Sequence, residues 1–274
     1  MWEEDLEQAA RRKVAWLIGI VVAAAIALGG WYWYAQRHHP AQSAPVARAP
    51  APPPVSAEPQ IAHPIATENT GAAALPAVND SDQLLRDSLA GVLGRRPVEQ
   101  YLMPQNIVRH IVVTVDSLPR RKVAVELRPV KATAGQTVIA TQGDITTLSD
   151  GNFARYGSLV RVVQATDMKA LAVVYQRLYP LFQQAYEDLG YPGKYFNDRL
   201  VEVIDHLLQA PETTAPLKLV QPRVMYEYAD ADLEARSAGQ KLLIRMGPAN
   251  ARALKAKLRE FRAEIVSSDV VKKK

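Results

Sequence analysis

The sequence of 274 residues contains no cysteine. This absence excludes disulfide bonds, a cysteine nucleophile and thiolate metal sites. The fold must therefore be held together by an apolar core. The part of the chain after about Asn79 is long enough for one, because chains of roughly 150 residues or more bury most of their surface.

The chain also lacks the short motifs that identify common enzyme classes. It has no G-x-S-x-G, H-E-x-x-H or G-x-G-x-x-G pattern. The stretch SAGQK at 237–241 resembles a phosphate-binding loop only superficially, because the G-x-x-x-x-G-K-[ST] spacing is missing. The sequence therefore predicts no particular reaction, no cofactor and no metal. It favours a non-enzymatic role without deciding the question.

A strong charge of one sign is also missing. The formal net charge is +5, which is compatible with contact to anionic lipid or nucleic acid but specific for neither. Basic residues gather at 120–122, along the last predicted helix and in the tail at 269–274. A cytoplasmic domain with these clusters would be a fair candidate for nucleic-acid binding. For an exported domain, lipid head groups or envelope polymers take that place and solvated charge is the simplest interpretation, so we expect no nucleic-acid partner.

One long apolar run stands near the N-terminus. Residues 14–34 carry no charge and, as a helix, would span roughly 31 Å, the thickness of a hydrocarbon core. Basic residues 11–13 precede the run, and the aromatic residues 31–34 end it as an interfacial belt would. A slight positive-inside bias predicts a single-pass inner-membrane protein, with residues 1–13 cytoplasmic, the bilayer as the partner of 14–34 and the rest periplasmic. The alternatives are a signal peptide cleaved near the AIA at 25–27 and a buried core helix.

The next region, residues 35–79, is rich in proline and alanine and has no apolar periodicity. Such a composition predicts a disordered or polyproline-like linker. The roughly 40 residues from His38 to about Val78 would reach about 35 Å as a flexible coil and up to about 120 Å when extended. His38, His39 and His63 fall outside the predicted fold, and solvated spacer residues are a simpler interpretation of the His38–His39 pair than a metal site.

Residues 80–268 read as a mostly helical domain with a small β-hairpin, followed by the basic tail at 269–274. Apolar residues recur at helical spacing between clear start and stop signals. The β-branched run TVIAT-QGD-ITTL, within 120–150, predicts the hairpin. The helices are expected from a Ser81 cap, from Pro104 to Pro119, over 152–164, from an Asp167 cap, over 237–247 and from Pro248 to about Ser267, with a short strand at 224–228.

The densest stretch is LYPLFQQAYEDLGYPGKYFNDRL, at 178–200. The apolar stripe keeps helical phase through Pro180, so a single helix is expected there despite the proline. Gly190 is placed to end that helix, and Asn197 to cap the next one. The stretch is therefore interpreted first as a helix hairpin built on aromatic packing.

Polar residues at this hairpin are the candidate binding site. Asp198, Glu202 and Asp205 share one face of the second helix, where carboxylates could bind a divalent cation or act as acid–base groups. A solvated face is simpler, because the apolar stripe lies on the opposite side. His110 is likewise interpreted as an ordinary residue at the edge of the core. The candidate residues are Tyr191, Tyr195, Asn197, Asp198, Arg199, Asp205 and His206.

Five stretches, RHIVVTVDSLPRRKV, NFARYGSLV, LYPLFQQAYEDLGYP, YFNDRLVEVIDHLLQAP and SAGQKLLIRMGPAN, resemble an uncharacterised proteobacterial family known as domain of unknown function 3014. The resemblance covers about Asp82 to Glu264. It implies a Gram-negative bacterial protein with one N-terminal span and a Pro-rich tether, and it assigns no catalytic or binding residues.

These observations predict an inner-membrane protein whose periplasmic domain is an interaction or assembly module with an envelope protein partner. The alternative is a cell-envelope hydrolase or ligand-binding protein with its site at residues 190–206. A concave pocket over the candidate residues would favour the alternative. The sequence does not predict the ligand or the oligomeric state.

Overall fold

The computed structural model describes residues 61–65, 74–213 and 216–266. The chain divides into two compact units, residues 1–57 and 58–274, and all described residues belong to the second. The predicted membrane span at 14–34 and most of the predicted linker lie outside them. None of the helices in the described residues is both long and apolar enough to cross a bilayer.

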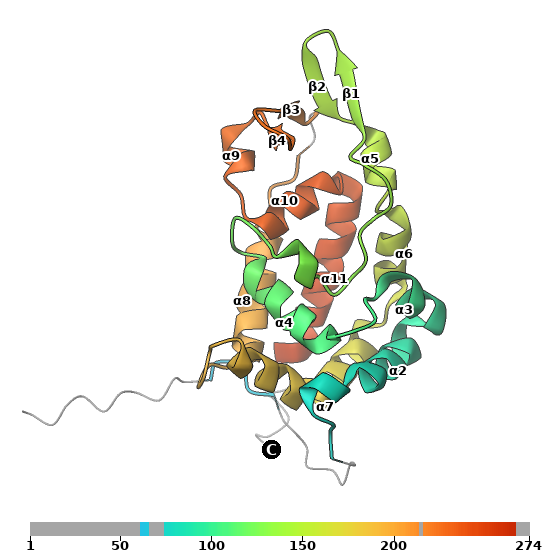
Figure 1. Cartoon of the computed structure of the whole chain (residues 1–274), viewed down its shortest axis with the longest axis vertical. Helices are drawn as coiled ribbons and strands as arrows, with labels where there is room; N and C mark the ends of the chain where they lie inside the picture. Colours follow the sequence, from blue (N-terminus) through green and yellow to red (C-terminus); the bar gives the residue numbers. More distant parts are fainter. Residues whose placement is uncertain (1–60, 66–73, 214–215, 267–274) are drawn as a thin grey trace, which may run out of the picture. The chain divides into compact units, whose positions relative to one another are not determined.

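The described residues form a mostly helical domain with a small antiparallel sheet (Figure 1), as the sequence predicts. The α-helices are α2 (Asp82–Leu93), α3 (Arg95–Tyr101), α4 (Ile107–Ser117), α5 (Asp150–Ala154), α6 (Gly157–Ala165), α7 (Met168–Asp188), α8 (Phe196–Leu208), α9 (Ala231–Glu234), α10 (Ala238–Arg245) and α11 (Pro248–Val266). The remaining elements are the 3-10 helices η1 (Val78–Asp80) and η2 (Val125–Leu127) and the strands β1 (Ile139–Gln142), β2 (Ile145–Leu148), β3 (Lys218–Val220) and β4 (Glu227–Tyr228).

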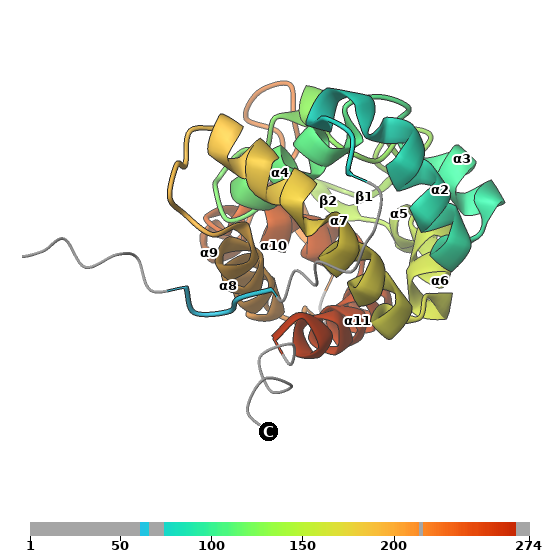
Figure 2. The same cartoon turned by 90° about the horizontal axis from the view of Figure 1, so that it is seen from below.

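Helix α7 is central to the largest buried cluster. It is one continuous helix with Pro180 inside, which confirms the prediction from the apolar stripe. The Asp167 carboxylate accepts the N–H groups of Lys169 and Ala170, so the predicted cap is also confirmed. Helix α7 contacts α2, α4, α8 and α11, and Figure 2 shows it between α2 and α4 on one side and α8 and α11 on the other. Leu178 is fully buried among these helices.

The sheet has the order β1-β2-β3-β4 and is antiparallel throughout. The predicted hairpin is confirmed, with Gln142 paired to Ile145 across a tight turn in which Gly143 has a φ of 58°. Strand β3 was not predicted, and the strand predicted at 224–228 is reduced to β4. Both strands are too short to show periodicity, and they form because they pair with β2 and with each other. The sheet packs on α10 through Ile244.

Two helix starts differ from the predictions. The Ser81 hydroxyl precedes α2 but donates to the carbonyl of Val78, so it does not cap α2. The carboxylate of Asp82 instead accepts the N–H groups of Asn106 and Ile107 at the start of α4. An acidic residue in one helix thus caps another, which local sequence spacing cannot reveal.

The single helix predicted over 152–164 is replaced by α5 and α6. The Asn152 side chain is fully buried; its amide donates to the carbonyl of Arg245 and its oxygen accepts the N–H of Val138. The Arg155 guanidinium, where the helix breaks, binds carbonyl groups in the loop before β1. These long-range hydrogen bonds override the local helical pattern.

The domain also begins earlier in the chain than predicted. Residues 61–65 and 74–79 belong to the predicted linker, yet Ile65 and Val78 lie in the same buried cluster as α7. The linker boundary at 79 is therefore too late, because two isolated apolar residues give no periodic signal. His63, placed outside the fold by its sequence context, lies in this segment, whereas His38 and His39 lie outside the described residues. Residues 61–65 are called the docked segment below.

Candidate functional site

The elbow, residues 190–206, comprises the turn after α7 and most of α8. Gly190 and Gly193 have φ angles of 109° and 73°, which favour glycine, so the predicted turn is confirmed. The Tyr191 ring stacks on Tyr186 with centroids 4.7 Å apart, and the Tyr195 ring packs on Tyr179 at 5.2 Å. Aromatic contacts between α7 and the turn therefore fix where α8 begins.

The first turn of α8 is capped by side chains of α7. The Phe196 N–H donates to the Gln183 side-chain oxygen at 2.9 Å, and the Asn197 N–H donates to the Tyr179 hydroxyl at 3.3 Å. The prediction that Asn197 caps α8 is therefore wrong, since α8 already includes this residue. Because the cap comes from α7, the Asn197 side chain is available for other contacts.

Three candidate residues hold the docked segment, which runs beside the start of α8 (Figure 2). The Asp198 carboxylate accepts the N–H groups of Ala62 at 3.0 Å and His63 at 2.7 Å. The Asn197 amide donates to the His63 carbonyl at 2.9 Å. The Tyr195 hydroxyl accepts the N–H of Ile65 at 2.6 Å. All four hydrogen bonds are made to main-chain groups of the segment.

Two buried tyrosines of α7 position the residues that make this contact. The Tyr175 hydroxyl donates to the Asn197 side-chain oxygen at 3.1 Å, which orients the amide toward the docked segment. Burial raises the pKa of Tyr175 and of Tyr179 well above the ordinary value, and neighbouring tyrosines add to the shift. Both hydroxyls therefore stay neutral donors near pH 7.

Two other candidates belong to a separate charged cluster centred on Asp116, which is only 5% exposed. Arg199 donates to its carboxylate at 3.2 Å and to its main-chain carbonyl at 2.9 Å. Tyr191 donates to the same carboxylate at 3.2 Å, and Arg120 is a further donor. Burial alone would lower the pKa of Arg199, but its hydrogen bond to Glu202 and the nearby carboxylates hold it above the ordinary value. The cluster ties α4 to α8.

The last two candidates lie near the end of α8 and contact other helices. Asp205 accepts two hydrogen bonds from Arg262 of α11, at 2.6 and 2.8 Å. The His206 ring nitrogen Nε2 lies 2.8 Å from the Ser237 hydroxyl. That hydroxyl accepts the N–H of Gln240 and so caps α10, which begins one residue later than the helix predicted over 237–247, and Ser237 is buried. The pair is therefore a helix cap and presents no exposed nucleophile.

The candidate residues thus form three separate groups along α8. The carboxylates of Asp198, Glu202 and Asp205 each have a different partner, respectively the docked segment, Arg199 and Arg262. In the described residues no group of three or more histidine or acidic residues is placed to hold a metal ion. The arrangement fits binding of a polypeptide backbone better than acid–base chemistry.

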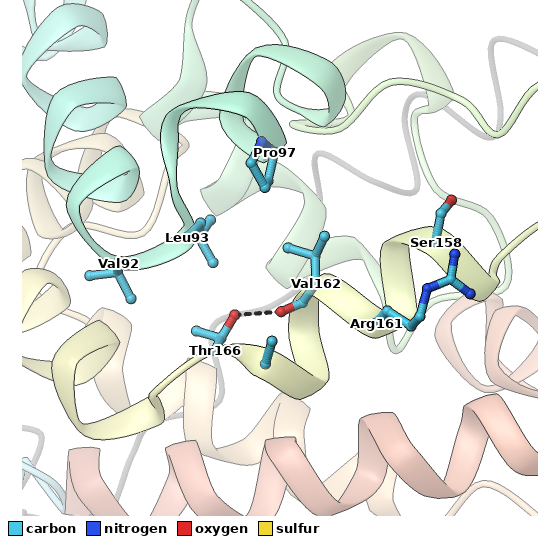
Figure 3. Close-up of a pocket in the computed structure, with 8 residues that line it drawn as sticks. Val92, Leu93, Pro97, Ser158, Arg161, Val162 and Thr166 are labelled. Atoms are coloured by element: carbon cyan, nitrogen blue, oxygen red, sulfur yellow. Dashed lines mark hydrogen bonds between the residues drawn. The ribbon is translucent and has the colours of Figure 1, made fainter.

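A pocket of about 300 Å³ lies elsewhere, between α6 and the end of α2 with the start of α3 (Figure 3). It includes none of the candidate residues of the elbow. Its walls are partly apolar, and Ser158 and Arg161 lie together on one side. The lining residues are Val92, Leu93, Pro97, Ser158, Arg161, Val162, Ala165 and Thr166.

Sequence reasoning missed Asp116 and Gln183. An acidic residue four positions after Val112 on the apolar face of α4 was the available signal for Asp116. Gln183 gave no signal, because its role depends on where the turn returns the chain. The docked segment gave only a weak signal of packing, namely the two isoleucines at 61 and 65.

The fold and the elbow define a mostly helical domain whose side chains bind the main chain of the docked segment. Residues 107–262 match the family described as "Protein of unknown function (DUF3014)", and the chain belongs to this family. The match confirms the resemblance seen in the sequence. Comparison with curated proteins and with solved structures gave no match.

Proposed function

We propose that the protein is a single-pass inner-membrane protein of a Gram-negative bacterium whose folded domain is an interaction or assembly module in the periplasm. The apolar run at 14–34 and its flanking residues support the anchor and its orientation. The resemblance to a proteobacterial family supports the Gram-negative origin. The bilayer is the partner of the anchor, and an envelope protein is the partner of the domain.

One observation carries the choice of an interaction module over an enzyme. The polar side chains at the start of α8 are engaged in hydrogen bonds to the backbone of the docked segment. Hydrogen bonds to main-chain groups, together with one buried apolar side chain, are how many domains recognise extended peptides. The elbow therefore has the chemistry of a recognition site.

Two experiments test the proposal. A reporter enzyme that is active only outside the cytoplasm, fused after Lys274, should be active; activity restricted to a cytoplasmic reporter would refute the orientation. A pull-down of the full chain from detergent extracts should enrich a specific envelope protein. The matched control is Val203→Asp, which places a charge in the core but keeps the anchor and tether. Equal recovery with wild type and control would count against the module.

The rival function is an envelope hydrolase or ligand-binding protein with its site at the elbow. If Asp198 and Asp205 were acid–base groups, replacing either with Asn would reduce turnover by about 10²–10⁴-fold. The interaction module predicts that complementation of a deletion strain survives Asp205→Asn, whereas Asp198→Asn, which removes one of the two acceptors for the docked segment, should weaken it. Loss of complementation by both variants, with normal thermal melts, would favour the rival.

A further inference from the structure

The docked segment is held by side chains of the elbow and by one anchor of its own. Its N–H groups at Ala62, His63 and Ile65 are all paired with the elbow. Pro64 has no N–H, so every main-chain N–H between residues 62 and 65 has an acceptor. The Ile65 side chain is only 6% exposed, whereas Ile61 is 51% exposed. Recognition therefore combines backbone hydrogen bonds with one apolar side chain after a proline.

The receiving side is built independently of the segment. The Tyr195 ring is placed by Tyr179, and the Asn197 amide is oriented by Tyr175. Asn197 itself is fully buried, and among the described residues its amide has, apart from the His63 carbonyl, only a long contact of 3.5 Å to the carbonyl of Ile265. A buried amide without a good acceptor is unfavourable. The elbow is therefore a preorganised site in which the docked chain supplies the acceptor for the Asn197 amide.

We propose that the elbow is a selective and reversible peptide-binding site whose ligand is the chain's own segment Ile61–Ile65. The ligand class is an extended segment in which a proline is followed by a buried aliphatic residue. Residues 61–65 are neither helix nor strand. The hydrogen bonds that hold them come from side chains of the elbow. Such a segment can leave without unfolding an element of the domain.

Release of the segment would change the length of the tether, a consequence that rests on the proposed membrane anchor. With the segment docked, residues 35–60 separate the anchor from the domain and reach at most about 80 Å as an extended polyproline chain. With the segment released, residues 35–73 reach about 120 Å. Docking thus shortens the maximal distance between the bilayer and the domain by about a third.

The first test is amide hydrogen exchange on the full chain in detergent, read by mass spectrometry. The test variant is Ala62→Pro, which removes an N–H that donates to Asp198. The control is Ile61→Pro, because no hydrogen bond between described residues uses the Ile61 N–H. Losing a hydrogen bond to a charged group should speed exchange at His63 and Ile65 about tenfold or more in Ala62→Pro only. Equal and rapid exchange in wild type and both variants would overturn the proposal.

The second test supplies the ligand in trans. In full-length Ile65→Asp the elbow should be free, and a labelled peptide with the sequence of residues 58–68 should bind it in fluorescence anisotropy. Binding should weaken about tenfold or more when the peptide carries the same Ile65→Asp change, or when the chain also carries Asp198→Ala. If the Ile65→Asp chain melts like wild type but does not bind the peptide, the proposed site is refuted. If the Ile65→Asp chain does not fold, the same experiment is done with Ala62→Pro.

Exchange measured at two protein concentrations separates docking within one chain from docking between two copies. Protection independent of concentration supports the proposal, and protection that rises with concentration would show occupancy by a second copy and overturn docking in cis. These measurements do not depend on membrane orientation. A cytoplasmic C-terminus would therefore refute the proposed function while leaving the peptide site intact.

Discussion

Replacing Asp116 with alanine tests whether the charged cluster holds the elbow in place. The change removes the carboxylate that accepts hydrogen bonds from Arg199, Tyr191 and Arg120. Because Arg199 lies on α8 and Asp116 on α4, the packing of these two helices should weaken.

The magnitude follows from the partners that remain. Removing one member of a buried ion pair typically costs about 3–5 kcal/mol. Arg199 keeps Glu202 at 2.9 Å and the main-chain carbonyl of residue 116 at 2.9 Å, and the Arg120 side chain is 58% exposed. These compensations reduce the expected loss to about 2–3 kcal/mol. For a domain of this size the thermal midpoint should fall by about 5–10 °C.

The assay is thermal and urea unfolding of the full chain in detergent, followed by far-ultraviolet circular dichroism. Tryptophan fluorescence does not report on the domain, because all four tryptophans lie before residue 35. The matched control is Asp205→Ala, whose ion pair with Arg262 is more exposed and should contribute at most about 1 kcal/mol. Equal losses for the two variants would refute the argument that burial gives the Asp116 cluster its strength.

Three further changes have defined outcomes. A Cβ on Gly239 would lie 2.5 Å from a Leu207 methyl group and 3.1 Å from a main-chain oxygen, so Gly239→Ala should destabilise by about 1–3 kcal/mol in urea unfolding, while Gly91→Ala, with nothing near, should not. Burial opposes ionisation of Glu234, but the hydrogen bonds from Lys241 and from the Tyr228 N–H, together with the charges of Lys241 and Arg245, outweigh it and hold the pKa of Glu234 below its usual value. Its stabilisation is therefore present above about pH 4.3 and lost as pH falls through the lowered pKa, so Glu234→Gln should flatten the acid side of the stability curve measured by circular dichroism. Tyr175→Phe removes the hydroxyl that orients the Asn197 amide and should lower the thermal midpoint by a few degrees, an effect of about 1 kcal/mol, and unchanged melting would contradict that role.

The parts of the fold predicted correctly are those whose signals are local and periodic. The stripe of α7 passes Pro180 without losing phase, and the Asp167 cap stands directly before it. The β1–β2 hairpin was equally visible, because its two strands flank one short turn containing Gly143. In each case the residues that decide the structure are neighbours in sequence.

The wrong predictions concern residues whose partners are far away in the chain. Asn197 has the residue type and position of a cap, but Tyr179 and Gln183 take that role from α7. Asp198 was interpreted as a solvated carboxylate, but its hydrogen-bond donors, the N–H groups of Ala62 and His63, lie more than 130 positions earlier in the chain. Composition alone could not show that Ile65 enters the core, because a single buried residue in a Pro-rich stretch has no periodicity.

The contact between the docked segment and the elbow is the central claim, and nuclear magnetic resonance tests it most directly. In the full chain, selectively labelled at isoleucine and tyrosine, the Ile65 amide proton should show a cross-peak to the Tyr195 ring, whose hydroxyl lies 2.6 Å from the Ile65 nitrogen. The cross-peak should disappear in Ala62→Pro. An Ile65 amide with a random-coil shift, rapid water exchange and no cross-peak in the wild-type chain would contradict the account.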